Sequence, residues 1–128
     1  MRARVLVVDD ELSILITFQA ILEANGFDVE TASSGKEAME KLKAEIFQVV
    51  ISDLRMETPD AGRDVIRCAK AQPYKPIAVL QTAYPVDQTE WEGWGADGLF
   101  EKPVSIEAMV TELERLVLCK NDVRSHTV

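Results

Sequence analysis

The sequence predicts an α/β fold in which five βα units form a doubly wound, five-stranded parallel sheet with helices on both faces. Two observations support this prediction. Strand-like and helix-like segments alternate five times along 128 residues, and the strand-like runs are short and apolar. Continuous apolar runs are typical of parallel strands that are covered on both faces. A chain of this length suits one domain with a sizeable core.

The first two strands and the helix between them follow from apolar runs and one turn signal. Residues 3–8 form a continuous run rich in Val and Leu, and residues 27–32 predict the second strand. Between them, apolar residues recur at helical spacing until Asn25-Gly26, a pair that readily ends a helix. The apolar positions of this helix are Ile14, Leu15, Phe18, Ile21 and Leu22.

The middle of the chain predicts two further helices around the third strand. Ser34-Gly35-Lys36-Glu37 is a capping box, which favours the start of a helix. Residues 47–52 are the most apolar run and predict the third strand. A third helix contains residues 65–69, and two prolines bracket its exit.

The last third of the chain predicts two strands and two helices of unequal strength. Residues 77–80 and 98–100 predict the fourth and fifth strands. Residues 86–94 favour only a weak helix, because glycine disfavours helical backbone. The final helix starts near Ser105 and carries an apolar face. The residues of that face are Ile106, Met109, Val110, Leu113, Leu116 and Val117.

Composition and charge exclude several classes of function. Acidic residues outnumber basic ones by 22 to 14, so phosphate backbones and anionic lipid would repel a chain of net charge −8. The apolar runs are too short to cross a bilayer. Met1-Arg2 leads straight into a predicted strand, so we expect no signal peptide. Cys68 and Cys119 lack metal-ligand spacing, so we expect reduced thiols in a cytoplasmic protein.

Polar side chains follow four of the predicted strands, and parallel strands bring these ends to one edge. Asp9 and Asp10 follow the first strand, Asp53 the third, Thr82 the fourth and Lys102 the fifth. Ligands of open α/β sheets bind at this edge. Because three close carboxylates repel one another, a divalent cation such as Mg²⁺ or the Lys102 amine would have to compensate them. Each carboxylate taken singly is also explained as a cap of the following helix.

Four stretches together resemble the receiver domain of bacterial two-component response regulators, the CheY-like superfamily. They are Val7-Val8-Asp9-Asp10-Glu11, Ile51-Ser52-Asp53-Leu54-Arg55-Met56, Thr82-Ala83 and Phe100-Glu101-Lys102-Pro103. The resemblance covers the chain from Arg4 to about Leu118. It implies the flavodoxin-like strand order 2-1-3-4-5, with a receiver domain in residues 1–119 and a loose polar tail in residues 120–128.

The resemblance implies a role for each carboxylate. Asp53 would be the phosphoacceptor, whose side chain attacks a phosphohistidine and becomes an acyl phosphate. Asp10, Asp53 and the backbone carbonyl of Arg55 would bind Mg²⁺, or Mn²⁺ in its place, and Asp9 would act through water. Such a domain assists its own phosphorylation and dephosphorylation and is otherwise not an enzyme.

The remaining pocket residues also receive roles from the resemblance. Lys102 would pair with one phosphoryl oxygen and Thr82 would donate its hydroxyl to another. Ala83 would leave room for the phosphate donor, and Phe100 would be an aromatic switch that turns inward. A plain core residue is the alternative for Phe100, and an ordinary strand residue is the alternative for Thr82. The bond from Lys102 to Pro103 would be cis.

The implied partners are proteins. A sensor histidine kinase or a phosphotransfer protein would supply the phosphoryl group, and a downstream protein or a fused output domain would read the signal. A homodimer through the fourth helix, fifth strand and last helix is also in keeping with the resemblance. Only ten residues follow Leu118, so the sequence leaves open whether the receiver acts alone or belongs to a longer protein.

Two places depart from the family pattern. Glu57 stands where the family has proline, and the usual loop glycine is displaced to Gly62. We expect Glu57 to point to water, with tuning of the metal site as the alternative. Trp91 and Trp94 occupy a short segment that normally has small residues, and they are expected either partly exposed on the signalling face or packed on the sheet.

Three other functions compete with this interpretation. A flavodoxin-like nucleotide or flavin binder would have Ser, Thr and Gly after the first strand, whereas Asp9-Asp10-Glu11 would repel phosphate without a metal. An aspartate-dependent phosphatase would have a second aspartate and a threonine after Asp53, which Leu54 to Glu57 do not supply. A degenerate receiver would serve only for docking, and the complete set of pocket residues argues against it.

Overall fold

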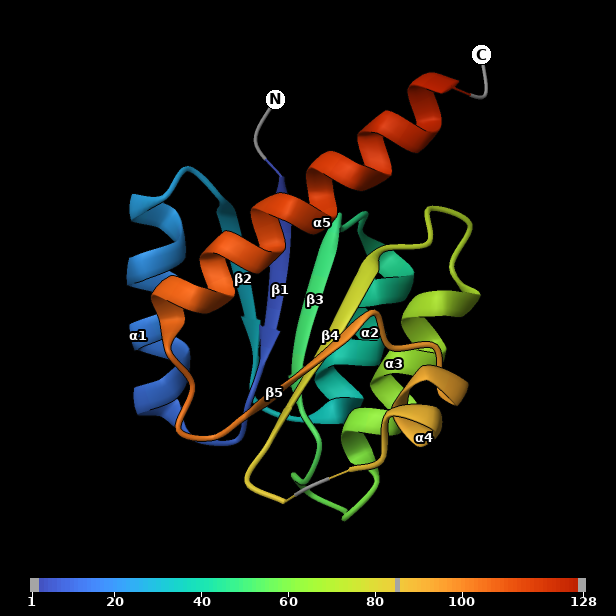
Figure 1. Ribbon diagram of the computed structural model, residues 1–128. Helices are drawn as coiled ribbons and strands as arrows, with labels where there is room; N and C mark the ends of the chain where they lie inside the picture. The colour runs from blue at the N-terminus through green and yellow to red at the C-terminus, as the bar shows by residue number, and fades with distance from the viewer. Residues whose placement is uncertain (1–2, 85, 127–128) are drawn as a thin grey trace.

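The computed structural model describes residues 3–84 and 86–126, with side chains as far as residue 119. Ten elements alternate along the chain (Figure 1). They are β1 (Arg4–Val8), α1 (Leu12–Ala24), β2 (Asp28–Ala32), α2 (Gly35–Ala44), β3 (Val49–Asp53), α3 (Ala61–Ala71), β4 (Ile77–Thr82), α4 (Gln88–Gly93), β5 (Gly98–Glu101) and α5 (Ile106–His126). All strand pairs are parallel, in the order β2-β1-β3-β4-β5. The predicted fold class and strand order are confirmed.

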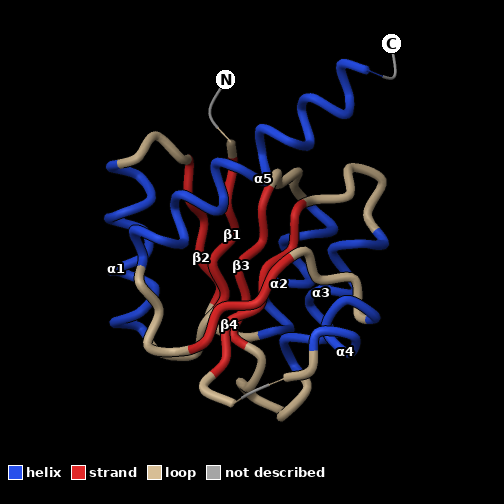
Figure 2. Tube along the Cα trace, viewed as in Figure 1, coloured by secondary structure: helices blue, strands red, loops and turns tan. Residues whose placement is uncertain are grey.

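The sheet forms the middle of three layers (Figure 2). Helices α1 and α5 pack on one face, where Phe18, Leu22 and Met109 contact the inward residues of the strands. Helices α2, α3 and α4 cover the other face, where Leu42 and Val65 lie in the core. Because β1, β3 and β4 are buried on both faces, their apolar residues follow one another rather than alternating with polar ones.

The register brings the carboxyl ends of four strands level. Val8 pairs with Ser52, so the residues after β1 lie beside the end of β3. Asp53 pairs with Gln81 on β4, and the next residue of β4, Thr82, pairs with Glu101 on β5. Every polar group that the sequence placed at a strand end therefore lies along one short edge of the sheet.

Helix ends follow the predicted signals with two differences. Ser34 accepts a hydrogen bond from the Glu37 N–H, as a capping box requires, but the Glu37 carboxylate accepts from Ser33 rather than from Ser34. Helix α4 has six residues, in agreement with the predicted weak helix. Helix α5 continues to His126, which contradicts the loose tail, because residues 120–126 contain neither Gly nor Pro to end it.

Two predictions concern residues outside those described. They are the absence of a signal peptide at Met1-Arg2 and the end of the tail at residues 127–128. The division into a receiver at 1–119 and a tail at 120–128 stays a prediction. Within the described part of the chain, no helix has the length and apolarity needed to span a membrane.

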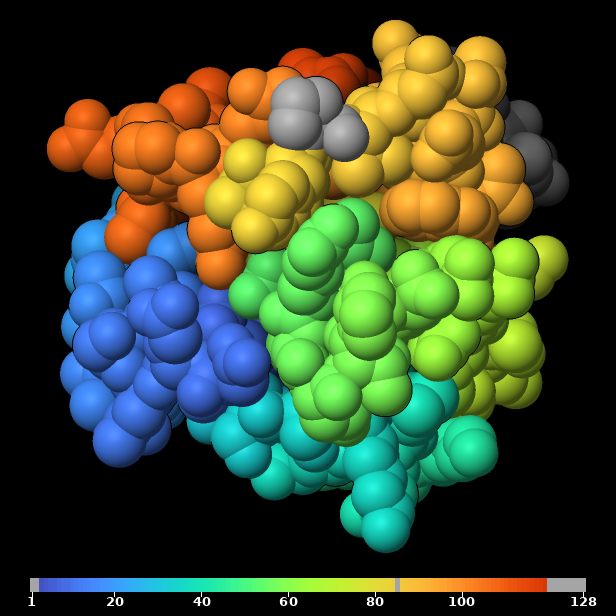
Figure 3. Space-filling model, turned by 90° about the horizontal axis from the view of Figure 1, so that it is seen from below, coloured from blue at the N-terminus to red at the C-terminus, as the bar shows by residue number. Residues whose placement is uncertain are grey.

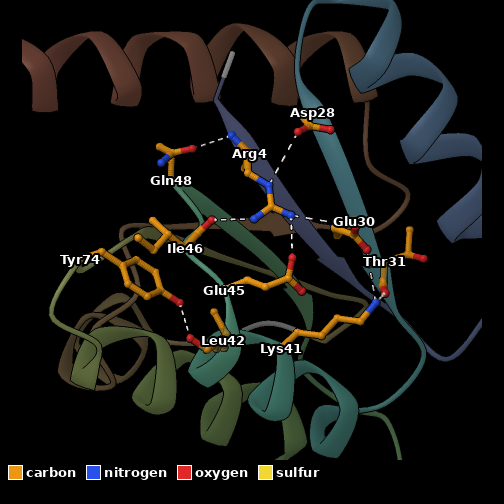
Figure 4. A network of polar contacts seen from close by, with 10 residues as sticks. All are labelled: Arg4, Asp28, Glu30, Thr31, Lys41, Leu42, Glu45, Ile46, Gln48 and Tyr74. Atoms are coloured by element: carbon orange, nitrogen blue, oxygen red, sulfur yellow. Dashed lines mark hydrogen bonds and ion pairs between the residues drawn. The ribbon is translucent and has the colours of Figure 1, made fainter. Parts of the chain in front are cut away.

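A polar network fixes the opposite end of the sheet (Figure 4). The Arg4 guanidinium lies 4.7 Å from the centre of the Phe47 ring and 2.9 Å from the Glu45 carboxylate. It also donates to the Ile46 carbonyl, and the Arg4 N–H donates to the Gln48 side chain. This one residue therefore links the start of β1 to the loop before β3 and holds the register that aligns the far edge.

Candidate functional site

Three aspartates converge at the carboxyl edge of the sheet. Asp9 and Asp10 follow β1 and Asp53 ends β3, and one oxygen of each lies within 4.8 Å of the others. Asp9 and Asp53 are buried, whereas Asp10 is exposed. Figure 3 looks onto this edge, where the segments after β1, β3, β4 and β5 meet in blue, green, yellow and orange. The edge can therefore hold a cation through carboxylate oxygens and still admit a ligand.

Lys102 supplies a positive charge to this cluster. Its Nζ lies 3.1 Å from Oδ2 of Asp53 and 3.5 Å from Oδ2 of Asp9. The Lys102 N–H donates to the Thr82 carbonyl, which holds the start of the loop after β5 against the end of β4. The Lys102-Pro103 bond is cis, as expected from the resemblance. The predicted amine and two of the predicted carboxylates are thus in direct contact.

Asp9 is held on both of its carboxylate oxygens. Oδ1 accepts the N–H of Glu11 at 2.9 Å, and Oδ2 lies 3.5 Å from the side-chain nitrogen of Gln81. Gln81 is buried within β4, and the sequence did not predict a place for it in the site. Its one signal is that it interrupts the apolar run of β4 directly before Thr82.

The electrostatics of the cluster follow from burial. Burial raises the pKa of Asp53, and the hydrogen bond from Lys102 offsets only part of this effect. Burial likewise raises the pKa of Asp9 against the N–H of Glu11 and the charge of Lys102. Burial lowers the pKa of Lys102, but Asp53 and Asp9 outweigh it and raise that pKa overall. The pocket therefore has uncompensated negative charge that a divalent cation would neutralise.

We expect the variant Asp53→Asn to gain stability relative to the wild type as pH rises through the acidic range. The pKa of Asp53 is raised in the folded protein above its ordinary value of 3.8. At pH values between the ordinary pKa of the unfolded chain and the raised pKa of the folded protein, folded wild type binds more protons than the unfolded chain. Its free energy of unfolding therefore falls as pH rises. Asn carries no such proton. Urea unfolding of both proteins without divalent metal, between pH about 4 and 8, measures the difference; a pH-independent difference would contradict the raised pKa.

The other predicted pocket residues, Thr82, Ala83 and Phe100, lie at the end of β4, directly after it and in β5. Thr82 is buried, and its hydroxyl oxygen accepts the N–H of Tyr84 at 3.1 Å. Ala83 is exposed, and its side chain is small. Phe100 is half-buried and packs against the core cluster under α1 and α5. The roles expected for these three residues stay predictions.

The rim contains a contact that the sequence did not predict. The Arg55 guanidinium, from the loop after β3, lies 4.1 Å from the centre of the Tyr84 ring, in the loop after β4. Both side chains are exposed. This cation–π contact joins the two loops beside the carboxylates. The sequence predicted a role only for the backbone carbonyl of Arg55. The contact of its side chain was missed because contacts between distant loops have no local sequence signal.

Glu57 is exposed and lies outside the cluster of converging aspartates, and its carboxylate contacts the start of α2. Its two carboxylate oxygens accept the N–H groups of Gly35 at 2.9 Å and Lys36 at 3.1 Å, at the start of α2. Burial raises the pKa of Glu57, but these N–H groups outweigh it and lower that pKa. The side chain is exposed, as expected, but the sequence did not predict that its carboxylate would bond the N–H groups at a helix start, which attract negative charge.

Gly62 allows α3 to start close against the end of β3. Its N–H donates to the Leu54 carbonyl at 2.9 Å. A Cβ at this position would lie 2.2 Å from the Asp53 carbonyl oxygen and 2.6 Å from the Leu54 Cα. The displaced glycine noted in the sequence is therefore required by a close backbone approach rather than by a turn.

Trp91 and Trp94 are partly exposed and also pack on the sheet, the two alternatives that the sequence left open. Trp91 and Trp94 are half-buried and pack against a cluster that includes Leu54, Ile66 and Leu80. They therefore cover the sheet next to α3 and remain partly exposed beside α4.

A cavity of about 540 Å³ lies on the other side of the site, between α1 and the loop after β5, and Ile14, Lys102 and Val104 line part of it.

Comparison with known sequences gives one consistent family. A family model described as the response regulator receiver domain matches residues 5–114. The transcriptional regulatory protein ZraR of Escherichia coli strain K12 is 29% identical over 96% of this chain and 28% of its own length. The alginate biosynthesis transcriptional regulatory protein AlgB of Pseudomonas aeruginosa is 36% identical over 81% of this chain and 23% of its own length. The chain thus spans about a quarter of these relatives.

Solved structures agree with this match. The chemotaxis response regulator CheY4 of Vibrio cholerae superposes with a TM-score of 0.81 at 30% identity, over 90% of this chain and 98% of that one. The response regulator TrrA of Thermotoga maritima, solved in complex with Mg²⁺-BeF, superposes with a TM-score of 0.78 at 27% identity, over 91% of this chain and 99% of that one.

Proposed function

This chain belongs to the response regulator receiver domain family, and from this membership we propose that Asp53 is its phosphoacceptor. The observation that carries the proposal is the contact of the buried Asp53 carboxylate with Lys102, beside Asp9 and Asp10. In the proposed reaction a carboxylate oxygen attacks the phosphorus of a phosphohistidine. The new O–P bond forms as the N–P bond breaks, and the imidazole leaves with the electron pair and takes a proton.

The residues around Asp53 would hold the transferred group. Lys102 is already 3.1 Å from Oδ2 of Asp53, so its amine needs only a small shift to reach a phosphoryl oxygen. The hydroxyl oxygen of Thr82 accepts the Tyr84 N–H, which leaves the hydroxyl proton for a second phosphoryl oxygen. Phe100, half-buried beside them, would turn inward as Thr82 moves. Exposed Ala83 would leave the donor room to approach.

The converging carboxylates suit a hard divalent cation. We propose that Asp10, Asp53 and the Arg55 carbonyl bind Mg²⁺, and that Asp9 acts through water; Mn²⁺ is the alternative ion. Mg²⁺ accepts carboxylate, water and phosphate oxygens together, and three carboxylates within 4.8 Å provide such a set. When bound, the ion neutralises charge that develops on the phosphoryl oxygens. Asp10 is exposed and so accessible to the ion.

The surface beside Lys102 suits a protein donor, which we propose is a histidine kinase or a phosphotransfer protein. The cavity between α1 and the loop after β5 opens next to the site. On the same helix Leu12 is 70% exposed and Ile16 is 59% exposed. Exposed apolar side chains beside a reactive group are typical of a docking surface. We place the protein in the cytoplasm.

The output would come from another protein or from a fused domain. The relatives ZraR and AlgB are named transcriptional regulatory proteins, and the chain matches about a quarter of each. We propose that phosphorylation changes the surface of α4, β5 and α5, through which two copies of the chain would associate. The half-buried Trp91 and Trp94 lie at this surface and would report the change.

Acetyl phosphate tests the phosphoacceptor proposal directly. With Mg²⁺ we expect the intact protein to gain the mass of one phosphoryl group, and peptide mapping after borohydride reduction should place it at Asp53. Chelation of the metal should prevent the gain, and beryllofluoride should change Trp fluorescence only with Mg²⁺. A modification that forms equally without divalent metal, or at another residue, would refute the proposed site.

A further inference from the structure

Glu57 connects the loop after β3 to the start of α2. It lies in the middle of the loop from Leu54 to Asp60, and its carboxylate accepts two backbone N–H groups from Gly35 and Lys36. The loop is otherwise a tight turn, in which the Thr58 carbonyl accepts the Met56 N–H. A carboxylate that bonds two N–H groups at a helix start gains from both hydrogen bonds and the helix dipole.

The same loop contains the backbone carbonyl proposed as a metal ligand. The beginning of the loop is fixed because the Leu54 N–H donates to the Gln81 carbonyl, and its end is fixed by the close packing of Gly62. Arg55 lies between these two points, two residues before Glu57. The Glu57 contact with α2 therefore limits how far the Arg55 carbonyl can move from the carboxylate cluster.

We propose that Glu57 is a positioning residue of the metal site, which holds the Arg55 carbonyl in place by tying its loop to α2. The inference rests on the proposed function, since it assigns a task to the loop only if a cation binds there. Glu57 is not a ligand, because among the described residues the converging carboxylates are Asp9, Asp10 and Asp53. Its charge is instead bound by the N–H groups of α2.

Magnesium affinity is the first test, measured by titrating MgCl₂ into labelled protein and following backbone amide shifts by NMR. We expect Glu57→Ala to weaken binding about tenfold, the range found when groups that orient metal ligands are removed. Glu57→Gln keeps one acceptor oxygen and should lose clearly less. The matched control is Asp60→Ala, which removes an exposed charge from the same loop and only a pair with Arg63; it should bind like the wild type.

A change on the other side of the contact makes the test independent of Glu57. Gly35 is the first residue of α2, a position that favours proline, and the preceding Ser34 is extended as proline requires. Gly35→Pro removes one N–H donor, whereas Gly35→Ala adds a Cβ and keeps it. We expect weaker Mg²⁺ binding in Gly35→Pro than in Gly35→Ala. Combined with Glu57→Ala, the proline should have a smaller effect than it has alone.

A positioning role separates affinity from chemistry. At saturating Mg²⁺ we expect Glu57→Ala to take up the phosphoryl group from acetyl phosphate at the wild-type rate. Equal weakening in Glu57→Ala, Glu57→Gln and Asp60→Ala would overturn the inference in favour of simple charge loss. Wild-type affinity in Glu57→Ala would overturn it as well. If the wild type itself bound no Mg²⁺, the proposed function would fail first, so the two failures are distinguishable.

Discussion

Asp53→Asn is expected to lower phosphoryl uptake from acetyl phosphate by roughly 10³-fold or more, a loss on the scale seen when an enzymatic nucleophile is removed. The amide nitrogen and oxygen carry no negative charge, so neither can form the acyl phosphate. Asp53 is only 8% exposed, and the shape of the side chain is kept, so the pocket should remain folded. Intact-protein mass spectrometry over time, with Mg²⁺ present, measures the rate.

Stability separates loss of the nucleophile from loss of the fold. Asp53→Asn removes one of three converging carboxylates, which offsets the loss of its contact with Lys102. Thermal unfolding at neutral pH should therefore give a midpoint no lower than that of the wild type. The matched control is Asp60→Asn, which changes an exposed carboxylate in the loop after β3. This variant should be phosphorylated like the wild type. Undiminished uptake by Asp53→Asn would mean that another residue accepts the phosphoryl group.

The fold was predictable because its signals are local. Each strand is an apolar run and each helix has periodic apolar residues, and right-handed crossovers then restrict the topology. The pocket followed from the fold, since parallel strands bring Asp9, Asp53 and Lys102 to one edge whatever the loops do. The flavodoxin-like binder is not favoured by the family match.

The rim was not predictable for the same reason. Glu57 accepts a hydrogen bond from the start of α2, and the Arg55 guanidinium lies over the Tyr84 ring. Each contact joins segments that follow different strands. No periodicity or cap signal in the sequence encodes such a contact, because it depends on where two separate loops end in space. The contact of Gln81 with Asp9 was not predictable either, because a single polar residue in an apolar strand does not indicate which side chain it meets.

Gly62→Ala is expected to lower the free energy of unfolding by roughly 3 kcal/mol or more, at the upper end of what overpacking costs. The added Cβ would lie 2.2 Å from the Asp53 carbonyl oxygen and 2.6 Å from the Leu54 Cα. Both atoms belong to the backbone, so no side-chain rotation can relieve the overlap. The start of α3 must move away from β3, which weakens the Gly62 hydrogen bond to Leu54.

The matched control is Gly93→Ala, because a Cβ there meets no atom within 4 Å and the residue ends α4. That variant should be as stable as the wild type or gain up to about 1 kcal/mol, since alanine restricts the unfolded chain. Urea unfolding of the wild type, Gly62→Ala and Gly93→Ala gives the three free energies of unfolding to compare. Because the new Cβ would overlap the backbone carbonyl of Asp53, folded Gly62→Ala should also take up the phosphoryl group more slowly at saturating Mg²⁺. This sets it apart from Glu57→Ala, in which only the metal affinity changes. Wild-type stability in Gly62→Ala would show that α3 does not need its close approach to the phosphoacceptor strand.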